Sequence, residues 1–173
     1  MQDNSKDNNL IIAIKNLTAD SILFNNIAGT TEVYTKESIE QQLKIILSEV
    51  EELVTAFKSE TPVSVAAEAV DVVVTVLGLL QKLNNAGIDV PEITDRIGQK
   101  NLDKFPDVSQ VTLVNDTIKD YADKGITVAP SINLGKYVIR DSNGKVRKAL
   151  GFTPVVLDDC TTDELRFGFP SLQ

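Results

Sequence analysis

The stretch from residue 62 to residue 86 constrains the fold of this chain more than any other part of the sequence. It is apolar on nearly every face between Val65 and Leu80, and many of its side chains are valines. Such a run alone would suggest a buried strand, but about 25 residues without a turn signal are too long for one strand. We therefore expect a central helix that other helices surround, including helices of a second subunit.

A membrane span is the competing interpretation of the same run. Glu68 and Asp71 lie inside it, and ionised groups are costly in hydrocarbon, so we expect no contact with a membrane. Residues 1–9 are polar and lack the basic and apolar blocks of a signal peptide. We expect this N-terminus to be disordered and the protein to be cytoplasmic, in a bacterial cell or a phage-infected host.

Apolar periodicity predicts further helices on both sides of the central one. Residues 10–27, 35–58, 91–105 and 108–124 carry helical stripes. The helix 35–58 begins at Thr35 or Ser38 and is followed by a break at residues 59–62, where Thr61 can cap the next helix and Pro62 suits its first turn. Residues 10–125 are therefore predicted to form an all-α domain, an antiparallel helical bundle completed by oligomerisation.

The pattern changes after residue 125. Residues 137–140 and 145–147 predict two short strands, and Asp141-Ser142-Asn143-Gly144 between them is typical of a turn. The segment 126–173 is expected to hold this β-hairpin and an acidic, then aromatic tail, packed on the same domain.

Composition excludes several kinds of chemistry. The 173 residues carry a net charge of −8 and no histidine. This excludes a Ser-His or Cys-His nucleophile and His-ligated zinc, and it argues against a surface that binds duplex nucleic acid. Cys160 is the only cysteine, so it forms no intramolecular disulfide. Carboxylates must carry most of any metal or acid–base chemistry.

Four carboxylates stand out by their spacing. Glu49 and Glu52 share one helix face, and Glu68 and Asp71 repeat the spacing on the next helix. The two pairs are centred on residue 60, so in an antiparallel hairpin they face each other at the same height. Glu68 and Asp71 also interrupt an apolar helix, where unpaired charge is costly. Oxygen ligands at this density favour a hard cation such as Mg²⁺. The alternative is a solvated acidic face, to which Glu51 would also belong.

These carboxylates, followed by Asn101 and Lys104, resemble the motifs of the MazG-like, all-α nucleoside triphosphate pyrophosphohydrolases. This superfamily includes dimeric dUTPases and phosphoribosyl-ATP pyrophosphohydrolases, and the resemblance covers about residues 20–158. It implies a homodimer or a dimer of dimers that cuts a nucleotide between its α and β phosphates, giving a monophosphate and pyrophosphate. It also implies Mg²⁺, which Mn²⁺ could replace, bound by Glu49, Glu52, Glu68 and Asp71, with Glu49 or Glu52 activating a water.

The same resemblance implies phosphate contacts from the segment 100–105. Asn101 and Lys104 are three residues apart on one helix face and suit a polar clamp on a triphosphate. Family members commonly have an arginine two residues before the asparagine, and here it is Gln99. That contact is therefore expected from Lys100 or is missing. Without the resemblance, these would be ordinary surface residues.

Two further groups have a functional and a structural interpretation. The hairpin segment 136–148 has a net charge of +4, so Lys136, Arg140 and Lys145 could cover a bound polyphosphate, or they could be solvated residues that protect an edge strand. Phe24 and Asn25 could contact the base, although we favour a place in the core for Phe24.

Three functional classes remain open from the sequence. The first is the Mg²⁺-dependent pyrophosphohydrolase acting on a nucleoside triphosphate, or on phosphoribosyl-ATP. The second is a protein of the same fold that binds and sequesters a nucleotide without cutting it. The third is a structural bundle with exposed acidic pairs.

Overall fold

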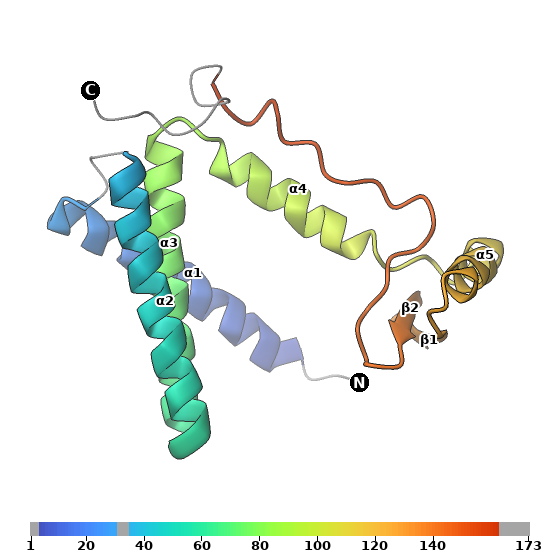
Figure 1. The fold of residues 1–173 in the computed structure, drawn as a ribbon. Helices are drawn as coiled ribbons and strands as arrows, with labels where there is room; N and C mark the ends of the chain where they lie inside the picture. Colours follow the sequence, from blue (N-terminus) through green and yellow to red (C-terminus); the bar gives the residue numbers. More distant parts are fainter. Residues whose placement is uncertain (1–3, 31–34, 163–173) are drawn as a thin grey trace. The chain divides into compact units, whose positions relative to one another are not determined.

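The computed structural model describes residues 4–30 and 35–162, which form two compact units. Among these residues, the first unit comprises residues 4–90 and 158–162, and the second comprises residues 91–157. The described elements are five helices and one two-stranded antiparallel hairpin, in the order α1 to α5, β1, β2 (Figure 1). This confirms the all-α class with a small C-terminal hairpin.

The first helix, α1 (Asn4–Ala28), begins earlier than predicted. Residues 4–9, for which we predicted disorder, are described as part of this helix, while residues 1–3 lie outside the described part. No glycine or proline interrupts residues 4–28, so nothing stops the helix from extending past its apolar segment. Asp7 in the first turn adds a favourable interaction with the helix dipole.

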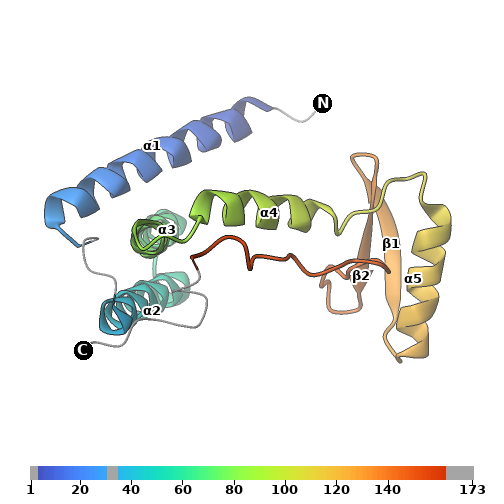
Figure 2. The same cartoon turned by 90° about the horizontal axis from the view of Figure 1, so that it is seen from above.

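The helices α2 (Lys36–Ser59) and α3 (Pro62–Asn85) form the antiparallel hairpin that the sequence predicts (Figures 1 and 2). Thr35 and Ser38 cap α2 reciprocally, because each side chain accepts a hydrogen bond from the backbone N–H of the other. Thr61 accepts from the Ser64 N–H at 3.2 Å and so caps α3. The break at residues 59–62 is therefore confirmed, with caps on both helices.

Helix α3 contacts both α2 and α1. Ala56 of α2 is 1% exposed, and the Gln42 side chain donates to the Thr75 carbonyl of α3 at 3.0 Å. On α1, Asn26 accepts from the Gln81 side chain at 2.8 Å. Among the described helices, α3 alone is long and apolar enough to cross a membrane by length and composition.

The second unit is built from α4 (Val90–Leu102), α5 (Val111–Asp123), β1 (Val128–Asn133) and β2 (Lys136–Asp141). Its small core contains Val114 of α5, Val128 and Ile139 of the hairpin, and Ala149. Helix α5 packs against the hairpin (Figure 2), and the chain divides into its two units after Val90. Residues 158–162 group with the first unit, where the Cys160 carbonyl accepts from the Asp89 N–H at 2.8 Å.

The hairpin differs from its prediction. Residues 136–141 form β2, but their partner is Val128–Asn133, with Pro130 opposite Ile139. The predicted partner, residues 145–147, contributes only an isolated bridge between Arg140 and Val146. Pro130 made the true partner hard to recognise, although an edge strand tolerates a proline because its N–H need not pair.

The tip of this hairpin has unusual backbone geometry. Leu134 has a φ of +49° and Gly135 a φ of +76°, the combination that tight hairpin turns require. Glycine adopts it freely, but a leucine there is strained. The Leu134 side chain is 84% exposed, so no packing within the described chain compensates for the strain.

Candidate functional site

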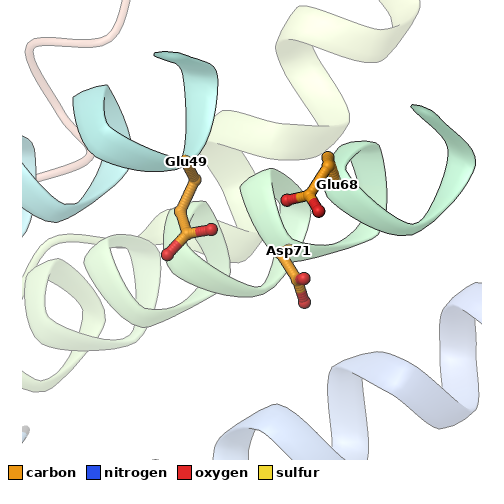
Figure 3. Close-up of side chains that lie close together, drawn as sticks. All are labelled: Glu49, Glu68 and Asp71. Atoms are coloured by element: carbon orange, nitrogen blue, oxygen red, sulfur yellow. The ribbon is translucent and has the colours of Figure 1, made fainter. Parts of the chain in front are cut away.

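Three of the four predicted ligands meet across the α2–α3 hairpin. Glu49 of α2 and Glu68 and Asp71 of α3 each place one carboxylate oxygen within 4.8 Å of the others (Figure 3). Glu49 and Glu68 are half-buried and Asp71 is exposed. The tightly capped break aligns the helices, so residues equidistant from residue 60 lie at the same height. The structure thus brings three of the four predicted acids together, and their role as metal ligands stays a prediction.

Glu52 lies outside that set of three but still affects it. Its side chain is exposed. The pKa of Glu68 is raised, first by burial and then by the negative charges of Glu52, Asp71, Glu60 and Glu49. Glu60, the C-cap residue that follows α2, was not among the predicted site residues. Only its position beside the break could have suggested it.

No cation neutralises this cluster within the described part of the chain. None of the four predicted ligands forms an ion pair there with a lysine or arginine. Lys82 on α3 is buried, and burial lowers its pKa, which disfavours its charged form. Several like charges are thus held close together on two helices, an arrangement that a bound cation would stabilise.

The predicted phosphate-binding residues belong to the second unit. Lys104 donates to the Asn101 side chain at 2.6 Å, so these two form the neighbouring pair that their spacing predicts. Lys100 is directed elsewhere: its ammonium lies 3.2 Å from the Thr153 hydroxyl and 3.7 Å from the Asp103 carboxylate. Gln99, in place of the expected arginine, donates to Asp103 at 3.3 Å.

The basic residues of the hairpin are partly engaged. Lys136 pairs with Asp107 at 2.7 Å. Asp107 lies outside the segment 136–148, so it does not enter the net charge of +4 of that segment. Arg140 donates to the Gly144 carbonyl at 2.9 Å, while Lys145 is exposed. Of the three residues predicted to cover a substrate, Lys145 is therefore the one whose side chain forms no hydrogen bond or ion pair with another described residue.

Asp141 holds the turn that follows β2. Its carboxylate accepts from the backbone N–H groups of Asn143 and Lys145 and pairs with Arg147 at 2.7 Å. Burial alone would raise the pKa of Asp141, but the bonds from Lys145, Arg147 and Asn143 outweigh burial and lower it. This carboxylate has a structural role, which its side-chain exposure of 4% supports.

The two predicted base contacts lie on α1. Phe24 is 64% exposed, so its favoured assignment to the core is wrong for the described chain. Asn25 is half-buried, and its side chain lies beside Gly78 of α3, where a Cβ would be 3.5 Å from its Nδ2. Gly78 therefore allows α1 and α3 to approach closely at this point.

Comparison with known families identifies the segment that carries the carboxylates. The family described as phosphoribosyl-ATP pyrophosphohydrolase matches residues 24–101. These residues belong to the MazG-like superfamily. The chain therefore carries a nucleotide pyrophosphohydrolase domain, a hydrolase of acid anhydrides. No curated protein and no solved structure matches it.

The matched segment contains some of the candidate site residues and leaves others outside. All four carboxylates and both α1 residues fall within it, and Asn101 is its last residue. Lys104 and the hairpin lie beyond it. The MazG-like match thus covers the helices that bring the acids together, while the roles of Lys104, Lys136, Arg140 and Lys145 rest on sequence reasoning.

Proposed function

We propose that this MazG-like domain hydrolyses a nucleoside triphosphate between its α and β phosphates, with Mg²⁺ bound by the acids of the α2–α3 hairpin. The observation that carries the proposal is the meeting of three carboxylate oxygens within 4.8 Å, without a cationic partner among the described residues. A polyphosphate is itself anionic, so it can approach such a cluster only if a cation lies between them.

The donor set fits the proposed metal. Carboxylate oxygens are hard ligands, and Mg²⁺ commonly takes a few carboxylates and completes its shell with phosphate oxygens and water. Glu49, Glu68 and Asp71 are the proposed ligands, and Mn²⁺ could replace Mg²⁺ with the same donors. When bound, the metal would neutralise phosphate oxygens and polarise the bond to be cut.

Glu52 and Glu49 are the proposed acid–base residues. Glu52 is exposed and lies outside the closest three acids, so its carboxylate is free to orient a water and accept its proton. The water oxygen forms a bond to phosphorus as the bond to the bridging oxygen breaks. A nucleoside monophosphate and pyrophosphate are released. Glu49 can share this role from the neighbouring turn of α2.

Two groups of residues are proposed to hold the rest of the substrate. Asn101 and Lys104 would contact the polyphosphate, with Lys100 as an additional cation and Lys136, Arg140 and Lys145 as a cover. Asn25, and Phe24 beside it, would contact the base. Asn25 packs on Gly78, which lies two turns beyond Asp71 on α3, about 10 Å along the helix axis. This separation supports a nucleotide that extends along α3 from the acids.

We also propose that the protein is a homodimer or a dimer of dimers. Leu43, Leu47, Val50, Val54 and Phe57 follow a 4-3-4-3 spacing on α2 and are all at least 37% exposed. This is the pattern of a helix–helix seam. A second copy of the chain would cover it, and exposed apolar surface of this extent usually marks an interface.

A substrate panel tests the catalytic proposal. The purified protein is incubated with Mg²⁺ and each of the common ribo- and deoxyribonucleoside triphosphates, and with phosphoribosyl-ATP, and products are separated by chromatography. We expect a monophosphate and pyrophosphate from at least one triphosphate and none in excess chelator. Turnover of phosphoribosyl-ATP alone would favour the activity for which the matching family is named. Tight binding without products would favour sequestration, and orthophosphate as first product would contradict the mechanism.

A further inference from the structure

A stripe of polar residues follows one face of α3, which is otherwise an apolar helix. Its members recur with a 4-3-4-3-4-3 spacing and therefore share that face; they are Ser64, Glu68, Asp71, Thr75, Gly78, Lys82 and Asn85. Between Ser64 and Lys82, the only other polar residue of the sequence is Gln81. Gly78 and Lys82 are buried, so exposure to solvent does not account for this end of the stripe.

The stripe faces the other two helices of the first unit. Its two acids meet Glu49 of α2. Further along, the Gln42 side chain of α2 donates to the Thr75 carbonyl at 3.0 Å. At Gly78, a Cβ atom would lie 3.3 Å from Nε2 of Gln42 and 3.5 Å from Nδ2 of Asn25 on α1. The stripe thus leads from the acids to Asn25, the residue proposed to contact the base.

Lys82 follows on the same stripe, one turn beyond Gly78 and about 16 Å along the helix axis from Asp71. Its side chain is 8% exposed, and no hydrogen bond or ion pair joins it to another described residue. Burial lowers its pKa. A lysine side chain can donate but not accept, and a buried donor without a partner costs folding free energy. An acceptor on a bound ligand would recover that cost.

The position of Lys82 along α3 determines which part of a nucleotide it can meet. In the proposed function the phosphates lie at the acids, three turns away, whereas the base lies beside Asn25 and Gly78, one turn away. Because Lys82 lies on the far side of Gly78 from the acids, it would meet the edge of the base that points away from the sugar. That edge carries an oxygen in uracil, thymine, guanine and hypoxanthine, and an amino group in cytosine and adenine.

We propose that Lys82 selects the base, with its Nζ donating a hydrogen bond to the oxygen at position 4 of a pyrimidine or position 6 of a purine. An amino group at that position cannot accept this bond and would leave Lys82 buried without a partner. The inference rests on the proposed function and adds to it a preference for bases with an oxygen at this edge.

Calorimetry with the full chain and Mg²⁺ tests the preference without turnover. The ligands are α,β-imido triphosphates, which are not cut at the proposed bond, in two matched pairs: deoxyuridine with deoxycytidine, and inosine with adenosine. We expect the member with the oxygen to bind about tenfold more tightly in at least one pair. Equal binding within both pairs, or preference for the amino member of either, would overturn this inference alone. Binding of none of the four would contradict the proposed function as well.

Matched variants assign the preference to Lys82. Lys82→Met keeps a long unbranched side chain without the donor, so the ligand with the oxygen should lose about tenfold in affinity and its amino counterpart should change little. Its melting temperature should not fall, since a buried polar group without a partner is removed. Lys44→Met, at an exposed position of α2, should keep the preference. An equal loss of affinity for both members in Lys82→Met would assign Lys82 to the phosphates or to the fold and overturn the inference.

Discussion

Glu49 and Asp71 are equally far along the chain from residue 60, and their carboxylate oxygens lie within 4.8 Å of each other across the α2–α3 hairpin. Their approach brings together charges that repel one another, with no described cation between them. Such an arrangement costs folding free energy and is common where residues serve function at the expense of stability. The candidate metal site should therefore lower the stability of the metal-free protein, and this effect can be measured without knowing the substrate.

Replacing Glu68 by glutamine should lower the activity of the protein but raise the stability of its metal-free form. The amide keeps the size of the side chain and removes one charge, so we expect pyrophosphate release to fall about 100-fold or more, as for the loss of a metal ligand and its charge. The metal-free variant should melt at a higher temperature than the natural chain, and Mg²⁺ should raise that temperature less.

Glu51→Gln is the control for this variant. Glu51 belongs to the same acidic run of α2 and is exposed, but it lies outside the cluster. It should retain activity and the response to Mg²⁺. If the natural chain and both variants melt alike with and without Mg²⁺, the acids do not form a metal site.

The stability of the metal-free protein should depend on pH through Glu68. Because the pKa of Glu68 is raised in the folded chain, the folded state holds this proton more tightly than the unfolded state does. Its contribution therefore favours folding at acidic pH and is lost as the pH rises through the raised pKa. Melting temperatures measured against pH in chelator should show this decline for the natural chain. A decline of the same size in Glu68→Gln would assign it to other groups.

Thr117 should stabilise the second unit through two hydrogen bonds. Its hydroxyl is completely buried, donates to the Leu113 carbonyl at 2.7 Å and accepts from the Leu150 N–H at 3.0 Å. Thr117→Val leaves that N–H without its partner, so we expect a loss of about 1–3 kcal/mol in the free energy of unfolding, measured by denaturant titration. Thr112→Val, at an exposed position of the same helix, should change it far less.

A substitution at the strained tip of the hairpin should increase the stability of the protein. Asparagine tolerates a positive φ better than leucine does, so Leu134→Asn should raise the free energy of unfolding by about 1 kcal/mol. Gly135→Ala should lower it, because alanine is strained at a φ of +76°. Thermal melts of the two variants check the opposite signs. A lower melting temperature for Leu134→Asn would mean that the leucine makes a stabilising contact in the assembled protein.

The exposed seam of α2 can be tested with one charge. Leu47→Lys places an ammonium in the middle of the seam and should raise the dissociation constant of the dimer at least about tenfold, because burial of a leucine is worth about 1.5–3 kcal/mol. Ile45→Lys, at an exposed apolar position outside the seam, is the control. Sedimentation at several concentrations measures both, and a natural chain that is monomeric at micromolar concentration would contradict the seam as an interface.

The sequence was most informative where local signals agreed. The capping residue Thr61, the proline after it and the matched acidic pairs together predicted the hairpin and a meeting of four acids, of which the structure brings together Glu49, Glu68 and Asp71 but not Glu52. It was least informative where contacts are distant in the chain or a local rule is broken. Pro130 concealed a strand, and Leu134-Gly135 does not resemble the usual turn sequence.

The closeness of the acids along the chain also has a consequence for the order in which the protein forms. Glu49, Glu68 and Asp71 are contributed by two consecutive helices joined by a short break. Contacts of such short range form quickly, whereas distant ones are delayed by the entropy of closing long loops. Because synthesis proceeds from the N-terminus, the hairpin 36–85 can pair before α4, α5 and the strands have been made. The arrangement of these three acids can therefore be present in the nascent chain before the second unit has been made.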